Sequence, residues 1–151
     1  MQSTYKRRTL NNLQDTIDLG DEIAREIEDL KLLMLKGPLG VGKTSLVKGI
    51  AQRLGINEPI TSPTFTLSQH YLRGSRPLVH LDLYRLENPL SANELFLQEE
   101  EQANEIKALI IVEWPERLKI NIDDAWQIEL KYLPNAKRMA SILPPLIEAR
   151  R

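Results

Sequence analysis

Residues 37 to 44 of the chain read Gly37-Pro38-Leu39-Gly40-Val41-Gly42-Lys43-Thr44. This is the G-x-x-x-x-G-K-T pattern of a phosphate-binding loop. Glycines let the backbone curl so that successive N–H groups point at phosphate oxygens. Lys43 would bring a cation to the β- and γ-phosphates, and the Thr44 hydroxyl can ligate Mg²⁺. The stretch therefore predicts a site for a nucleoside triphosphate with Mg²⁺.

The residues on either side of the loop support this prediction. An apolar run at residues 32–35 enters the loop as a buried parallel strand would. Thr44 to Leu54 has a helical pattern that stops at Gly55. The positive end of that helix would face the bound anion. We therefore expect the nucleotide to be bound by Pro38, Leu39, Gly40, Val41, Gly42, Lys43, Thr44 and Ser45.

Composition sets the class of protein. The chain has 151 residues, and we expect residues 1–151 to form a single domain. The net charge of −1 gives no overall positive field to attract nucleic acid, and the absence of cysteine excludes thiolate chemistry. Met1 to Thr9 does not read as a secretory signal, and the longest apolar run, Ala108 to Val112, is too short to cross a bilayer. We expect a cytoplasmic protein without membrane association.

The apolar pattern along the chain alternates between helical and strand periods. It predicts a first helix over residues 12–29 and a later helix with Ser91 as N-cap and Glu94 completing a capping box. The acidic segment at 95–107 is typical of a solvated helix face or loop. Strands are expected at residues 65–72, 78–83 and 108–113, with an antiparallel hairpin formed by 127–132 and 138–143.

This order of elements predicts the fold class α/β. We expect a three-layer P-loop NTPase sandwich, with a mostly parallel central sheet, helices on both faces and the antiparallel hairpin at its C-terminal end. Ligands in such a sheet bind at the carboxyl ends of the strands.

Two acids stand at such strand ends. Asp82 closes Leu78-Val79-His80-Leu81-Asp82, and Glu113 closes Leu109-Ile110-Ile111-Val112-Glu113. A nucleotide site needs an acid to organise Mg²⁺ and to orient the attacking nucleophile. With Lys43, these acids are the predicted catalytic residues. The residues alone do not assign the two roles, but we favour Glu113 for the main one because its strand is more completely apolar.

Four further features near these strands each allow more than one interpretation. Residues 61–66 could form a switch that senses the γ-phosphate, or an ordinary loop. Arg85 could hold a phosphate, a partner carboxylate or tRNA, or form a structural salt bridge. Trp114 could lie against the nucleotide or serve packing. His80, in the middle of its strand, could be a core histidine or a base, and we favour the core histidine.

Four segments occur in order along the chain: GPLGVGKTS, TSPTFTL, HLDLYRL and IVEWPERL. Through them the chain resembles the TsaE (YjeE) family, the P-loop ATPase of bacterial tRNA threonylcarbamoyladenosine biosynthesis. The resemblance runs from the first helix to the terminal hairpin. It implies a compact P-loop fold, ATP and Mg²⁺ as cofactors, and an ATPase activity that is low without its partners.

The resemblance also implies partners and residue roles. The partners would be a threonylcarbamoyl transferase subunit and its paralogous companion, with tRNA reached only through that complex. ATP hydrolysis would reset the complex between turnovers. By motif, Lys43 serves the phosphates, Thr44 and Glu113 hold the metal, and Trp114 lies near the nucleotide.

The chain departs from the family pattern in two places. Pro38 and Val41 stand where an acidic residue and an alanine are common, which should alter the stiffness of the loop rather than its phosphate contacts. Residues 96–107 are more acidic than usual and lack a glycine-containing stretch, so a partner contact there does not carry over.

Three rival functions are weaker. A small-molecule kinase needs an arginine-rich lid, and residues 86–107 contain no arginine. A GTP-dependent switch protein would need an N-K-x-D motif, which the sequence lacks. A nucleic-acid-binding module would need a basic stripe and a stacking platform, whereas aromatic residues make up 5% of the chain and are scattered.

Overall fold

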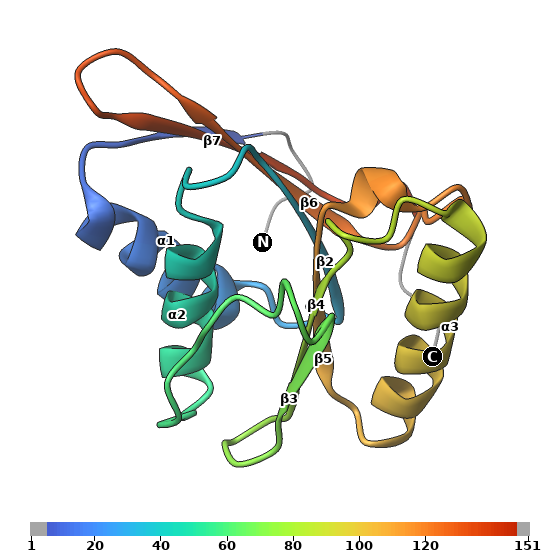
Figure 1. The fold of residues 1–151 in the computed structure, drawn as a ribbon. Helices are drawn as coiled ribbons and strands as arrows, with labels where there is room; N and C mark the ends of the chain where they lie inside the picture. Colours follow the sequence, from blue (N-terminus) through green and yellow to red (C-terminus); the bar gives the residue numbers. More distant parts are fainter. Residues whose placement is uncertain (1–5, 148–151) are drawn as a thin grey trace.

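A single seven-stranded sheet organises the computed structural model, which describes residues 6–147. Its strands run in the order β1-β7-β6-β2-β5-β4-β3. Helices α1 and α2 cover one face and α3 covers the other, so the molecule has three layers (Figure 1). The strands are β1 (Lys6–Leu10), β2 (Leu32–Lys36), β3 (Ser68–Tyr71), β4 (Leu78–Asp82), β5 (Leu109–Glu113), β6 (Trp126–Tyr132) and β7 (Arg138–Leu143). The helices are α1 (Leu13–Glu26), α2 (Lys43–Arg53), α3 (Pro89–Glu105) and a short 3₁₀ turn, η1 (Pro115–Arg117).

The sheet is mixed, so the expectation of a mostly parallel sheet is wrong. Strands β4, β5, β2 and β6 run parallel to their neighbours in that group. The β1–β7, β6–β7 and β3–β4 pairs are antiparallel. The α/β class, the helices on both faces and the terminal hairpin agree with the expectation. The parallel signal came from the buried central strands alone, whereas β3 and β7 join the sheet antiparallel to the strands next to them in sequence, and β1 joins it by pairing with the distant β7.

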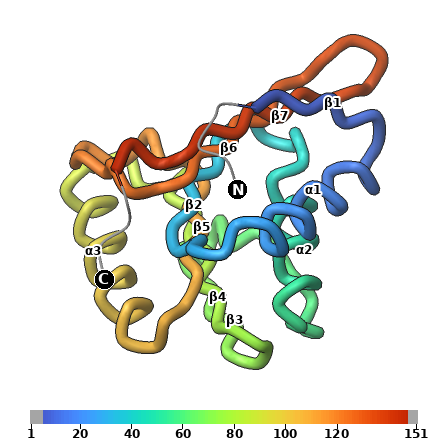
Figure 2. The backbone as a smooth tube through the Cα atoms, turned by 180° about the vertical axis from the view of Figure 1, so that it is seen from behind, coloured from blue at the N-terminus to red at the C-terminus, as the bar shows by residue number. Residues whose placement is uncertain are grey.

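Strand β1 was missed altogether. It is a sheet edge and pairs with β7, beside which it lies in Figure 2. Its side chains alternate between partly buried and exposed, and only Leu10 is fully buried. Such a polar strand gives little apolar periodicity, and its ladder depends on residues more than a hundred positions away.

Three other boundaries differ from the expected ones. Helix α3 begins at Pro89 with Asn88 as its N-cap, whose side chain accepts a hydrogen bond from the Leu90 N–H, so Ser91 lies inside the helix. Strand β3 is shorter than residues 65–72 because residues 64–66 form a turn. Helix α1 ends at Glu26 rather than at residue 29. The acidic segment lies mostly in α3 and most of its residues are exposed, as expected of a solvated helix face, while Glu99 is buried beside His70 of β3.

Two apolar layers hold the sheet in place. Alternate residues of β4 and β5 face α1 and α2, among them Leu78 and Ile111, while the intervening residues, among them Leu81 and Val112, face α3. Because side chains alternate along a strand, Asp82 and Glu113 lie on the α1–α2 face, at the carboxyl ends of two adjacent parallel strands. The fold therefore gathers the predicted site on one edge of the sheet.

Close packing of α1 on α2 fixes where the loop helix sits. Gly20 and Gly49 lie at the crossing, and a Cβ on either would collide with the backbone of the opposite helix. Among the described residues, no helix is long and apolar enough to pass through a membrane.

Candidate nucleotide site

The segment between β2 and α2 has the backbone of an anion-binding loop. Gly37, Gly40 and Gly42 adopt φ values of +154°, +78° and +119°, which side-chain-bearing residues rarely reach. Gly42 is the N-cap of α2 and offers no side chain to its first N–H groups. Those donors and the positive end of the helix are therefore available to a phosphate.

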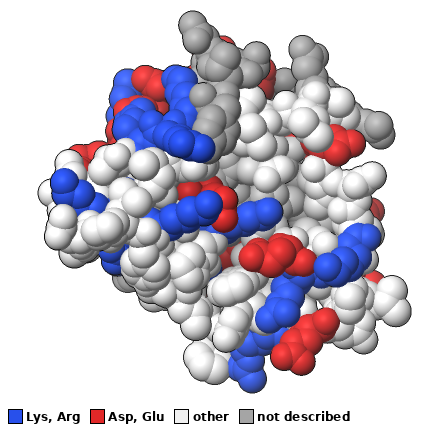
Figure 3. Space-filling view, turned by 90° about the horizontal axis from the view of Figure 1, so that it is seen from above, with Lys and Arg blue, Asp and Glu red and all other residues white. Residues whose placement is uncertain are grey.

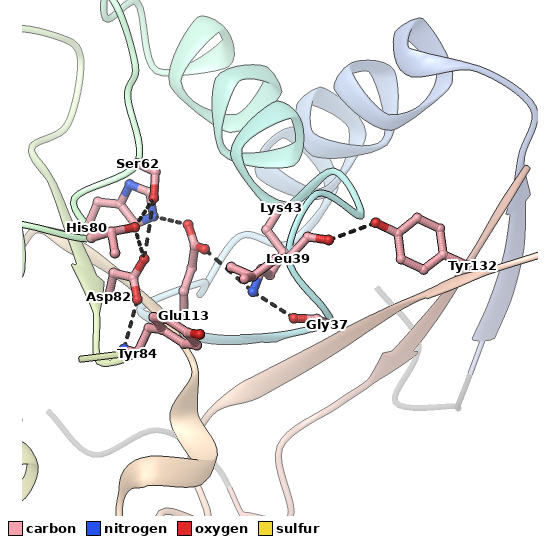
Figure 4. Close-up of polar contacts among 10 residues, drawn as sticks. Gly37, Leu39, Lys43, Ser62, His80, Asp82, Tyr84, Glu113 and Tyr132 are labelled. Atoms are coloured by element: carbon pink, nitrogen blue, oxygen red, sulfur yellow. Dashed lines mark hydrogen bonds and ion pairs between the residues drawn. The ribbon is translucent and has the colours of Figure 1, made fainter. Parts of the chain in front are cut away.

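Lys43 and Glu113 meet beside this loop. The Lys43 Nζ lies 3.8 Å from Glu113 Oε1 and donates a hydrogen bond of 2.7 Å to the Gly37 carbonyl. The two side chains are 6% and 3% exposed. Figure 4 shows them pointing toward one another across the loop. A buried carboxylate and a buried amine are thus held next to the phosphate-binding backbone.

Burial lowers the pKa of Lys43 below its ordinary value. Glu113, Asp82 and Glu116 act in the opposite direction but do not offset the loss of hydration. The protein's own acids therefore compensate the charged amine only in part. An added phosphate group would supply further negative charge, which is the electrostatic condition expected of a phosphate-binding lysine.

The Asp82 carboxylate accepts hydrogen bonds from the loop that precedes β3. Its Oδ2 accepts hydrogen bonds from Thr64 Oγ1 at 2.9 Å and Ser62 Oγ at 3.3 Å, and its Oδ1 accepts one from the Tyr84 N–H. The hydroxyls of the predicted switch therefore contact Asp82. These hydrogen bonds hold the loop against the end of β4, where Asp82 lies.

Trp114 forms a wall of the site. Directly after β5 its backbone has a φ of +58°, and its ring lies 4.3 Å from Lys43 Nζ and 4.8 Å from the Tyr84 ring. Arg85 points elsewhere and stacks on Phe65, with its guanidinium carbon 4.9 Å from the ring centroid. Neither the phosphate role nor the salt-bridge role considered for Arg85 describes this contact.

A pocket of about 310 Å³ joins these groups. Of the predicted site residues, Pro38 and Val41 are outside its lining; the Val41 side chain is buried in the core. The pocket is lined by Leu39, Gly40, Gly42, Lys43, Thr44, Ser45, Ser62, Thr64, Asp82, Glu113 and Trp114.

Sequence reasoning missed the terminal hairpin as part of the site. The Tyr132 hydroxyl donates a hydrogen bond of 2.7 Å to the Leu39 carbonyl, and Arg138 Nε donates one of 3.1 Å to the Val41 carbonyl. Arg138 also stacks on the Tyr132 ring. The hairpin therefore braces the loop from the side opposite Glu113 (Figure 4). No local pattern marks these two residues.

Sequence reasoning also missed the contact of His80 with the site. His80 is a core histidine, as expected, but its Nε2 lies 2.6 Å from Glu113 Oε2. The available signal was the two-residue spacing of His80 and Asp82, which places both on one face of β4.

Comparison with known proteins gives one consistent result. A family model described as "Threonylcarbamoyl adenosine biosynthesis protein TsaE" matches residues 10–140. The proteins named "tRNA threonylcarbamoyladenosine biosynthesis protein TsaE" from Nostoc and from Synechocystis are 38% and 43% identical. These matches cover 89% and 72% of this chain, and 83% and 69% of the relatives. The fold is similar to the crystal structure of Bacillus subtilis YdiB, with a TM-score of 0.71 at 24% identity over 96% of this chain and 88% of that one.

Proposed function

The chain belongs to the TsaE family, which takes part in tRNA threonylcarbamoyladenosine biosynthesis, and we propose that it is the ATP-binding and weakly hydrolysing component of that machinery. The observation that carries the proposal is the buried Lys43–Glu113 pair, 3.8 Å apart, beside a loop whose N-cap, Gly42, offers no side-chain cap to the first turn of α2. This arrangement supports the proposal, because a cation and an acid beside such a loop could both act on one γ-phosphate.

ATP binding would exchange partners around Lys43. Its amine would leave the Gly37 carbonyl for the β- and γ-phosphate oxygens, while the N–H groups that follow Gly42 hold the phosphates from below. Trp114 would close one side of the pocket. Burial lowers the pKa of Lys43 despite the nearby acids, so the negative phosphates would bind where they stabilise its charged amine.

The oxygen donors in the pocket fit Mg²⁺, which prefers hydroxyl, carboxylate, phosphate and water oxygens. Thr44 and Glu113 would hold the ion, which neutralises charge on the phosphates when bound. Among the described residues there is no group of three or more acidic, histidine or cysteine side chains that could hold a metal. The protein would therefore supply few ligands, leaving the others to phosphate and water. Both oxygens of Asp82 already accept hydrogen bonds, so Asp82 would orient the groups around the ion rather than bind it directly.

In the hydrolysis step the oxygen of a water molecule bonds to the γ-phosphorus, and the bond from that phosphorus to the β,γ-bridging oxygen breaks. ADP leaves with the bridging oxygen, and the water protons pass to phosphate and solvent. Glu113 would orient the water, and Lys43 would stabilise the charge on the transferring group. Few groups act on the phosphate, which fits a slow ATPase that depends on partners.

The adenosine would extend past the loop. A second hollow of about 110 Å³ shares Gly40 and Gly42 with the phosphate pocket, and it is lined on its far side by Leu10, Leu13 and Arg138. A nucleotide whose phosphates sit at Lys43 would place its base between the start of α1 and the terminal hairpin. The hairpin would then contact both the loop and the base.

Contact with tRNA would pass through the transferase subunit and its paralogous companion. Basic and acidic side chains are interspersed on the face shown in Figure 3, with no continuous basic track there. A kinase function remains less favoured. Helix α3, which occupies most of the segment where a lid would be needed, packs on the opposite face of the sheet from α1 and α2 (Figure 1).

Reconstitution with the two partner subunits tests the proposal. Multiple-turnover modification of tRNA should require this chain and ATP, and it should be lost with Lys43→Ala and with Glu113→Gln. Lys43→Ala should weaken ATP binding, whereas Glu113→Gln should bind ATP and fail to hydrolyse it. Robust phosphorylation of a small metabolite, preference for GTP, or full hydrolysis by Glu113→Gln would refute the assignment.

A further inference from the structure

His80 lies beneath the site and is completely buried. On β4 it is paired with Ile111 of β5, two positions away from the Asp82–Glu113 pair and on the same face, and its ring reaches diagonally to the Glu113 carboxylate. The His80 Nε2 lies 2.6 Å from Glu113 Oε2, while Lys43 Nζ lies 3.8 Å from Oε1. The two oxygens of Glu113 thus have different partners (Figure 4).

The chemistry of this contact assigns the proton. A carboxylate only accepts hydrogen bonds, so this contact is a hydrogen bond in the tautomer of His80 that carries its proton on Nε2. Its Nδ1 is buried and has no hydrogen-bond partner in the described part of the chain. An unpaired buried polar atom is costly, and an apolar side chain at this place would avoid the cost. Packing alone therefore does not account for a histidine here.

We propose that His80 is a positioning residue for Glu113. By holding Oε2 it fixes the rotation of the carboxylate and leaves Oε1 directed toward Lys43 and the pocket. Oε1 is then the oxygen presented to a water or to Mg²⁺. His80 does not itself touch the pocket, because it is absent from its lining and fully buried. This inference rests on the ATPase function proposed above.

A second histidine offers an internal comparison. His70 of β3 makes the same kind of contact, with Nε2 2.7 Å from Glu99 Oε2 on α3. That pair links two elements away from the nucleotide pocket, and neither member lines it. The His70 side chain is 40% exposed, so this pair controls for losing a histidine–glutamate contact, and not for losing a buried side chain, while the support of Glu113 is kept.

The test compares His80→Leu, His80→Gln, His80→Asn and His70→Leu in the full chain. A glutamine amide reaches about as far as Nε2 and can donate to Glu113, whereas an asparagine amide is one methylene too short. Single-turnover hydrolysis with protein in excess over ATP–Mg²⁺ gives the chemical rate. Titration with a fluorescent ATP analogue gives the affinity, and thermal unfolding gives the stability.

Removing the donor should slow hydrolysis by about 10- to 100-fold, as is typical for residues that orient a ligand from behind. His80→Leu and His80→Asn should show this loss while ATP affinity and melting temperature are maintained. His80→Gln should recover most of the rate, and His70→Leu should hydrolyse like the wild type.

Three results would overturn the proposal. They are a wild-type rate in His80→Leu, equal rates in His80→Asn and His80→Gln, and a parallel loss of rate, affinity and melting temperature. If His80→Leu does not fold, the Asn–Gln comparison decides. The wild-type protein separates the role proposed for His80 from the proposed ATPase function. If the wild type hydrolyses no ATP, with or without the partner subunits, the ATPase function is rejected.

Discussion

Replacing Gly49 with alanine sets two opposing effects against each other in the helix that carries the site. Alanine favours a helix over glycine by about 1 kcal/mol. Against this, a Cβ on Gly49 would lie 2.8 Å from the Ile17 carbonyl carbon and 3.0 Å from the Asp21 nitrogen, and closer still to the Ile17 oxygen. Because ordinary contacts begin at 3.4 Å, α1 and α2 must separate by at least about 0.6 Å.

The clash should dominate. Its partners are backbone atoms of α1, which cannot rotate away as a side chain would. Overpacking of this kind costs about 3 kcal/mol, the upper end of the usual range, so the net loss should be about 2 kcal/mol. For a chain of this length the melting temperature should fall by about 4–8 °C. ATP should also bind more weakly, because α2 begins at the phosphate-binding loop.

Thermal unfolding and nucleotide titration measure both effects. Lys48→Ala is the matched control, since Lys48 is the exposed neighbour on the same helix and its replacement should change stability by less than about 0.5 kcal/mol. An unchanged or higher melting temperature for Gly49→Ala would refute the close packing of α1 on α2.

Two further predictions concern the hairpin and the surface. Tyr132→Phe removes the 2.7 Å hydrogen bond to the Leu39 carbonyl, worth about 0.5–1.5 kcal/mol, so the melting temperature should fall by about 1–6 °C, and titration should show weaker ATP binding because the loop loses this support. Equal affinity would show that the loop does not depend on the hairpin. Burial and the charge of Asp124 raise the pKa of Glu100 above that of the unfolded chain, so its ionised form costs stability at neutral pH. Glu100→Gln should therefore raise the melting temperature by about 1–3 °C at pH 7, and the gain should vanish as the pH falls through the raised pKa to below the ordinary glutamate pKa of 4.5. A gain that persists in acid would contradict this cause.

Features that depend on neighbouring residues could be read without the structure. The loop at Gly37–Thr44 needs positive φ values and a helix start, and both are signalled by the residues themselves. The same holds for the strands that end in Asp82 and Glu113, because a short apolar run followed by an acid is a local pattern. The helix start at Asn88 was also signalled locally, by the proline that follows it, but Ser91 matched a capping box and was preferred.

Features that depend on distant pairing needed the tertiary structure. The polar edge strand β1, the contact of His80 with Glu113 and the support that Tyr132 gives to Leu39 each join positions far apart in the chain. Glycine conformation and apolar periodicity act within a few residues, so they determined the loop and its flanking elements. Strand register and hydrogen bonds between elements arise only when the chain has folded, so they decided which residues hold Glu113 and the loop in place.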